Sequence, residues 1–195
     1  MSADLQRIHV KMLAQAPPGF RLDPFLVIFG RWRQDKNHPA QWVDLADYAH
    51  MARGPGILLA GHQGNFAIDL NRPGLGVLYA GKKDFGGSND ERIVEAFRRC
   101  LDLAKALVAE PAYPAELQLR PEAWEFCIND RLQFPNNDVT DGMLRPAIEA
   151  ALNKLFGEGG CDMKRDNDPQ RRYGFSIRAA SGLTLDTLHQ RAKAG

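Results

Sequence analysis

The sequence predicts an α+β fold with a mixed, largely antiparallel sheet of about five to six strands. N-terminal helices and two longer amphipathic helices are expected to pack on this sheet. Three observations support this prediction: helical spacing of apolar residues before residue 52, a change to a period of two between residues 57 and 81, and a capped helix after Ser88. The 195 residues contain no internal repeat, low-complexity tract or Gly/Ser linker, so a single domain is expected over residues 1–195.

The first quarter of the chain is predicted to be helical. Apolar residues recur at roughly helical spacing over residues 3–15, up to the break at Pro17-Pro18-Gly19. A second helix is expected over residues 24–32, because proline suits the first turn of a helix. A third helix is expected over residues 38–52. Its apolar side consists of Trp42, Leu45, Ala46 and Ala49.

Three strands are predicted next, over residues 57–62, 65–70 and 75–81. Their apolar residues alternate with small or polar ones, as in a half-buried strand. Gln63-Gly64 separates the first two strands, and Asn71-Arg72-Pro73-Gly74 separates the second two. This pattern predicts an antiparallel meander.

The lengths of these two turns predict the register of the meander. If Gln63-Gly64 is a two-residue hairpin turn, His62 lies opposite Asn65. The four-residue loop pairs Leu70 with Leu75.

This register divides the meander into two unequal faces. The bulky face is expected to belong to the core and consists of Ile57, Leu59, Phe66, Ile68, Leu70, Val77 and Tyr79. The other face, here called the small-residue floor, consists of Leu58, Ala60, His62, Asn65, Ala67, Asp69, Gly76, Leu78 and Ala80. Small residues allow something to lie close to this floor. Two occupants are considered for this floor. One is a helix of the same chain, with the helix after Ser88 as the candidate, and the other is a ligand.

The helix after Ser88 is expected over residues 89–109. Ser88 and Glu91 have the spacing of a capping box, in which each side chain satisfies the backbone amide of the other residue. A strand around residues 123–132 follows, with apolar residues at alternate positions.

The C-terminal part of the chain is predicted to contain one long helix and three shorter elements. The helix holds the apolar residues between 144 and 155 and stops at Gly157, with Pro146 in its first turns. The other elements are strands over 161–165 and 172–178 and a short exposed helix over 184–193.

Composition excludes several classes of function. The chain has 25 Lys and Arg against 24 Asp and Glu, so its net charge of +1 gives no field of a single sign. Nucleic acid and membrane surfaces are therefore not expected partners. No secretory leader or membrane-spanning segment is visible, which predicts a cytoplasmic location. Three widely spaced cysteines predict reduced thiols, with no disulfide framework and no metal site.

Seven residues are candidate ligand-binding residues. His62, Asn65 and Asp69 form the polar rim of the small-residue floor. Lys82 and Lys83 precede the N-terminus of the helix after Ser88, where free amides favour an anion. Asp130 and Arg131 close the strand expected around residues 123–132, and strand ends often carry binding groups.

The leading hypothesis is a domain that binds a small molecule or an anion on the small-residue floor. Neither a reaction nor a cofactor is predicted. A first alternative is a protein-interaction or homo-oligomeric assembly module, in which a partner covers the floor. A second alternative is an enzyme with His62 as general base and Asp130 or Arg131 as its partner, which requires these side chains to converge within hydrogen-bond reach.

Overall fold

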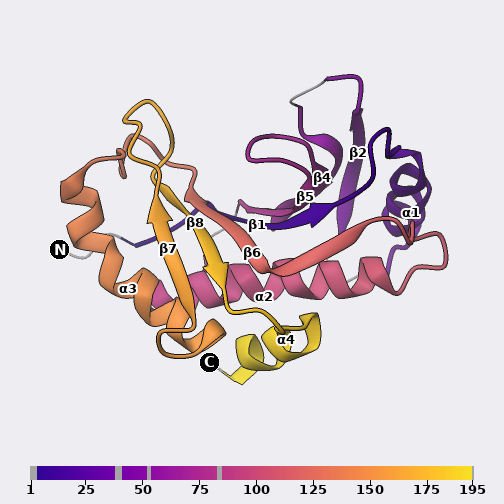
Figure 1. Cartoon of the computed structure of the whole chain (residues 1–195). Coiled ribbons are helices and arrows are strands. Elements are labelled where there is room, and N and C mark those ends of the chain that lie inside the picture. Colours follow the sequence, from indigo (N-terminus) through magenta and orange to yellow (C-terminus); the bar gives the residue numbers. More distant parts are fainter. Residues whose placement is uncertain (1–3, 38–40, 52–53, 83–84, 195) are drawn as a thin grey trace.

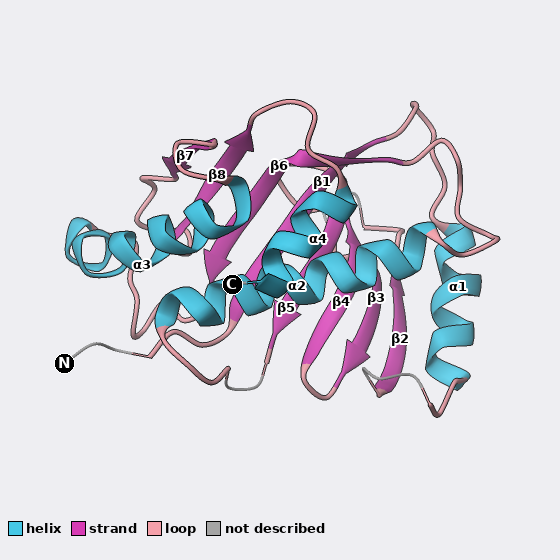
Figure 2. Cartoon of the chain, turned by 90° about the horizontal axis from the view of Figure 1, so that it is seen from below, coloured by secondary structure: helices cyan, strands magenta, loops and turns pink. Residues whose placement is uncertain are grey.

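The computed structural model of the chain describes residues 4–37, 41–51, 54–82 and 85–194. Its strands are β1 (Ile8–Gln15), β2 (Trp42–Tyr48), β3 (Gly56–Gly61), β4 (Gly64–Asp69), β5 (Gly76–Gly81), β6 (Gln118–Ile128), β7 (Cys161–Arg165) and β8 (Gly174–Ala179). Its helices are α1 (Asp23–Gln34), α2 (Asn89–Val108), α3 (Asp138–Phe156) and α4 (Leu185–Ala194). The strands form one sheet in the order β2-β3-β4-β5-β1-β6-β8-β7 (Figure 1 and Figure 2).

The structure confirms the α+β class and corrects the predicted sheet. The described part of the chain forms eight strands, and every pairing between neighbours is antiparallel, so the sheet is not mixed. Three helices were expected before the meander, but the described residues there form only one, α1.

The prediction of a helix over residues 3–15 is wrong, because this segment contains the central strand β1. Ile8, Val10 and Met12 are fully buried in the core, while His9 and Lys11 point to the opposite face. β1 pairs with β5 on one side and with β6 on the other. The period of two prevails over the helical spacing because both backbone edges of this segment find a partner strand.

The prediction of a helix over residues 38–52 is also wrong. Within this range, Trp42–Tyr48 forms β2, an edge strand paired with β3, whereas residues 38–40 and 52–53 lie outside the described residues. Trp42 and Leu45 pack against the core. α1 lies against β2, so the strand is partly covered on one face and does not alternate cleanly.

The meander is confirmed, with one change of register. β4 and β5 pair as predicted, but Ala60 lies opposite Asn65, so the β3–β4 turn consists of His62 and Gln63. Gly64 belongs to β4, where it pairs with Gly81, and a Cβ atom there would lie 2.8 Å from the Tyr79 ring. The slip is two residues, so the predicted faces persist except that His62 moves into the turn.

The four helices of the described residues lie on one side of the sheet (Figure 2). They cover the bulky face, where Phe66 is fully buried and its ring lies 5.6 Å from that of Phe29 on α1. On α2, the Cys100 thiol lies 3.8 Å from the carbonyl oxygen of Val77. The expectation that the helix after Ser88 covers the small-residue floor is therefore wrong.

The predicted helix after Ser88 is confirmed as α2, and its capping box is present. The Ser88 backbone amide donates to the Glu91 carboxylate at 2.7 Å. The predicted strand over 123–132 is shifted toward the N-terminus, since β6 covers residues 118–128. Pro121 is tolerated in β6 because the pairing with β1 is irregular there.

The long C-terminal helix is confirmed as α3, but Pro146 is not in its first turns. α3 begins at Asp138, where the Asn137 side chain accepts from the Thr140 amide at 2.9 Å, so Pro146 lies in the helix interior. The predicted strands near 161–165 and 172–178 pair as β7 and β8, and the last helix is α4.

Within the described residues, no helix is long and apolar enough to cross a membrane.

The close approach of β6 to β8 generates a prediction about Gly174. A Cβ atom at this position would lie 2.3 Å from the Phe126 carbonyl oxygen and 2.7 Å from the Cys127 Cβ. Gly174→Ala should therefore lower the free energy of unfolding by about 1–3 kcal/mol. Gly30→Ala on α1 is the matched control. Its added methyl group meets nothing within 4 Å, so it should raise the free energy of unfolding by about 0.5–1 kcal/mol. Urea unfolding of both variants tests this, and equal effects would contradict it.

Candidate functional site

The side of the sheet opposite the helices bounds a groove of about 1020 Å³, here called the open-face groove. Its floor includes side chains of β3, β4, β5, β1, β6 and β8. One wall is the β4–β5 loop, residues 71–73, and the other is the end of β7 with the following loop, residues 164–172. The groove therefore joins the small-residue floor to the C-terminal strands.

Three of the candidate residues from the sequence line this groove. Asn65 and Asp69 lie on β4, and Arg131 follows β6. Beside Asn65, the floor is apolar and consists of Leu58, Leu78 and Ala80. The structure thus brings together residues from two of the regions singled out in the sequence.

Three further candidates do not line the groove. His62 is exposed in the β3–β4 turn, and the Lys82 ammonium donates to the Gly61 carbonyl at 3.1 Å. The Asp130 carboxylate accepts from the Gln133 amide at 3.0 Å, within its own turn. Lys83, the last candidate, lies outside the described residues.

The N-terminus of α2 is an expected anion site in the sequence. In the structure, the carboxylates of Asp90 and Glu91 already lie there. Glu91 accepts from the Ser88 backbone, and the Ser88 hydroxyl donates to Asp90 at 2.6 Å. Asp90 also lies 3.1 Å from the Lys154 ammonium. An external anion there would meet two negative charges.

The structure does not bring His62 together with Asp130 and Arg131. His62 follows β3 and the other two residues follow β6, with three strands between them. At about 4.8 Å per strand, β3 and β6 are on the order of 19 Å apart along the sheet. General-base catalysis by His62 with these partners would require hydrogen-bond distances.

A buried ion pair lies in the floor of the groove. The Lys11 ammonium on β1 donates to the Asp69 carboxylate at 2.6 Å and to the Asn71 carbonyl at 2.9 Å. The Lys11 and Asp69 side chains are 5% and 3% exposed, and the Asn71 amide donates to Asp69 at 2.7 Å. Burial lowers the pKa of Lys11, although the Asp69 carboxylate beside it acts in the opposite direction. These contacts satisfy both carboxylate oxygens of Asp69.

His9 lies two residues before Lys11 and also faces the groove. It is opposite Ala80 on β5 and Cys127 on β6. Its Nδ1 is 3.3 Å from the Arg172 guanidinium, which also donates to the Asn129 side chain at 3.2 Å. Burial, together with the positive charge of Arg172, lowers the pKa of His9 to about 4, so the imidazole is neutral near pH 7.

Glu125 lines the floor of the groove, opposite Lys11 on β1 and Ser176 on β8. Burial raises the pKa of its carboxyl group, and this effect outweighs the positive charges of Arg178, Lys11 and Arg171. Among the described residues, none donates a hydrogen bond to the Glu125 carboxylate or forms an ion pair with it.

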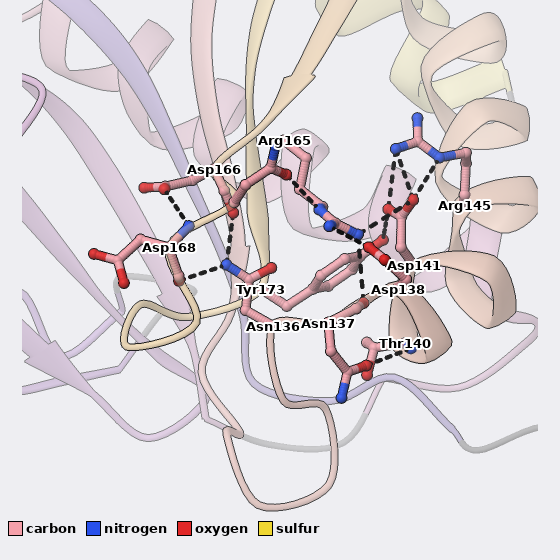
Figure 3. Close-up of polar contacts among 11 residues, drawn as sticks. Asn136, Asn137, Asp138, Thr140, Asp141, Arg145, Arg165, Asp166, Asp168 and Tyr173 are labelled. Atoms are coloured by element: carbon pink, nitrogen blue, oxygen red, sulfur yellow. Dashed lines mark hydrogen bonds and ion pairs between the residues drawn. The ribbon is translucent and has the colours of Figure 1, made fainter.

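A polar network holds the loop wall of the groove in place (Figure 3). The buried Asn136 amide donates to the carbonyl oxygens of Asp166 and Asp168, at 2.6 and 2.9 Å. Arg171 binds this segment through the Asp166 carboxylate at 2.5 Å and the Asp168 carbonyl at 3.0 Å. The network therefore positions the segment that precedes Arg172.

The groove carries more positive than negative side chains. Its seven cations are Lys11, Arg72, Arg131, Lys164, Arg165, Arg171 and Arg172, and its three carboxylates are Asp69, Glu125 and Asp166. Four of the cations have no carboxylate partner in the described part of the chain: Arg72, Arg131, Lys164 and Arg172. The groove is thus strongly basic in a chain whose net charge is +1.

Several of these residues were not candidates in the sequence analysis. His9, Lys11 and Glu125 were missed because their strands were predicted as a helix or were not assigned to the floor. The usable signal was the alternation of His9 and Lys11 with Ile8, Val10 and Met12, which is typical of a strand with one polar face.

No group of three or more His, Cys, Asp or Glu side chains that could hold a metal ion occurs among the residues described. No protein-family model and no curated protein matches this chain.

The low pKa of His9 predicts a pH-dependent stability. Between about pH 4 and 6.5 the unfolded chain protonates this histidine and the folded chain does not, so stability rises with pH across that window. The free energy of unfolding of the wild type should therefore be about 1–2 kcal/mol lower at pH 5 than at pH 7.5 because of His9.

His9→Gln should remove this part of the pH dependence, and urea unfolding at both pH values measures it. His62→Gln in the exposed turn is the control and should keep the wild-type difference. A His9→Gln curve parallel to that of the wild type would contradict a buried neutral imidazole.

Proposed function

We propose that this chain binds a small organic anion in the open-face groove. The observation that carries the proposal is the charge of the lining, seven cations against three carboxylates. Two of those carboxylates are already bonded, Asp69 to Lys11 and Asp166 to Arg171. An anion would therefore meet unpaired guanidinium and ammonium groups.

The apolar part of the floor indicates that the ligand has an apolar body. Leu58 and Leu78 are half-buried on the open face, with the nearly buried Ala80 beside them. A groove of about 1020 Å³ matches the upper end of the volume range for small-molecule sites. We place the apolar body over these residues and the anionic group near Arg172.

The lining supports a small anion better than a single-stranded nucleic acid. Nucleic-acid platforms stack bases on exposed aromatic rings. The two aromatic residues that line the described groove, Phe126 and Phe175, are 1% and 2% exposed, so their rings belong to the core.

The proposal is tested with three probes that separate charge from apolar body. We expect para-ethylbenzoate to shift the amide NMR signals of groove residues. The neutral para-ethylbenzyl alcohol and inorganic phosphate should shift them less at equal concentration, since each lacks one of the two features. The shifts should weaken as salt is added, because ions screen exposed charges.

Arg172→Ala should weaken the binding of para-ethylbenzoate about tenfold, because it removes a charge-assisted hydrogen-bond donor. Arg120→Ala is the matched control. Arg120 lies on β6, is paired with Glu122 at 2.8 Å and does not line the groove, so its replacement should leave the affinity unchanged. NMR titration of both variants measures the dissociation constants.

Other outcomes of these experiments would redirect the proposal. Equal binding of the alcohol and the benzoate would contradict recognition of an anion. Tighter binding of a labelled oligothymidylate, abolished by Arg172→Ala, would favour nucleic acid. A mass that rises with concentration in sedimentation, together with loss of the probe shifts, would favour the assembly module.

A further inference from the structure

We infer that Glu125 binds a positively charged nitrogen of the ligand, so that the groove selects a zwitterion with an apolar body over a simple anion. This inference rests on the proposed function and names the class of ligand. It follows from the position of Glu125, from its lack of a bonded partner among the described residues, and from the contacts that already hold Lys11, Asp69 and Asp166.

Glu125 is the third of seven side chains in a continuous row on the open face. Across the sheet this row contains Lys164, Ser176, Glu125, Lys11, Leu78, Ala67 and Leu58. Glu125 therefore lies between the basic C-terminal strands and the apolar part of the floor. A ligand that contacts both regions must pass over it.

The Glu125 carboxylate differs from the other two acidic groups of the groove. Asp69 is bonded to Lys11, and Asp166 is bonded to Arg171. Glu125 has no bonded cation or hydrogen-bond donor among the described residues, yet it is half-buried. A desolvated carboxylate without a partner is costly, and such groups are typical of binding sites.

The groove cation directly opposite Glu125 on β1 is not available to it. Lys11 lies directly opposite it on β1, but two of the Lys11 ammonium protons are held by Asp69 and by the Asn71 carbonyl. Because Asp69 and Lys11 are almost fully buried together, moving the ammonium toward Glu125 would leave Asp69 as an unpaired buried charge. A cation from the ligand carries no such cost.

Glu125 is also well placed relative to the anion site. Arg172 contacts His9, and His9 is two residues from Lys11 along β1, the strand position opposite Glu125. Two residues of a strand span roughly 7 Å. A ligand whose anion contacts Arg172 can therefore place a nitrogen on Glu125 if a short apolar spacer joins the two groups.

The inference is tested with a matched pair of probes. In para-(aminomethyl)benzoate a benzene ring separates an ammonium group from a carboxylate, and para-ethylbenzoate has the same shape without the ammonium group. Wild-type protein should bind the zwitterion about tenfold more tightly, as measured by NMR titration. Equal affinity, or a preference for para-ethylbenzoate, would overturn the inference.

Glu125→Gln should remove this preference and should bind para-ethylbenzoate at least as tightly as the wild type does, since it removes a negative charge from the groove. Retained binding of para-ethylbenzoate also shows that the variant is folded. Glu122→Gln is the control on the same strand. Glu122 is paired with Arg120 and does not line the groove, so this variant should keep the preference.

The outcomes separate the inference from the proposed function. If para-ethylbenzoate binds the groove and the zwitterion has no advantage, the anion site stands and the role of Glu125 is wrong. A zwitterion preference that persists in Glu125→Gln also overturns the role of Glu125. If neither probe binds to the groove, the proposed function and the inference fail together.

Discussion

The sheet is continuous because β1 pairs along both of its edges. On one side it joins β5 and the rest of the meander, and on the other it joins β6 and the C-terminal strands. Side chains of a strand alternate between faces, so burying Ile8, Val10 and Met12 beneath the helices sends His9 and Lys11 to the other face. The polar character of the groove is thus a direct consequence of how β1 fills the core.

No described helix covers the open face, so the charged groups of the groove decide which ligands can bind there. Lys11 and Asp69 form a buried ion pair at 2.6 Å, and loss of either partner from such a pair typically costs about 3–5 kcal/mol. Because the pair is neutral overall, it does not determine the sign of the groove. That sign comes from the arginines and lysines of the walls, whereas Glu125 introduces one negative charge on the floor. The lining is therefore basic but not uniform, which is the basis for expecting a ligand with groups of both signs.

The two wrong helices have a common cause. In residues 3–15 and 42–48 the apolar residues satisfy both a helical period and a partial period of two, and local spacing could not separate them. The meander was predictable because its alternation is regular and its turns are short. The β3–β4 register differs by two residues from the predicted one, because Gly64 pairs with Gly81 in the strand and the turn consists of His62 and Gln63. A slip of an even number of residues preserves the faces, so Asn65 and Asp69 remained on the predicted side.

Local periodicity and helix caps were enough to predict the α+β class, the amphipathic helices α2 and α3, and the division of the meander into a bulky and a small-residue face. They could not determine which face the helices cover or which strands lie beside the meander. Those are decided by contacts between distant segments, such as β1 with β6, whose pairing depends on burial in the whole molecule. For the same reason, only the tertiary structure brought Lys11, Glu125 and Arg172 to one groove.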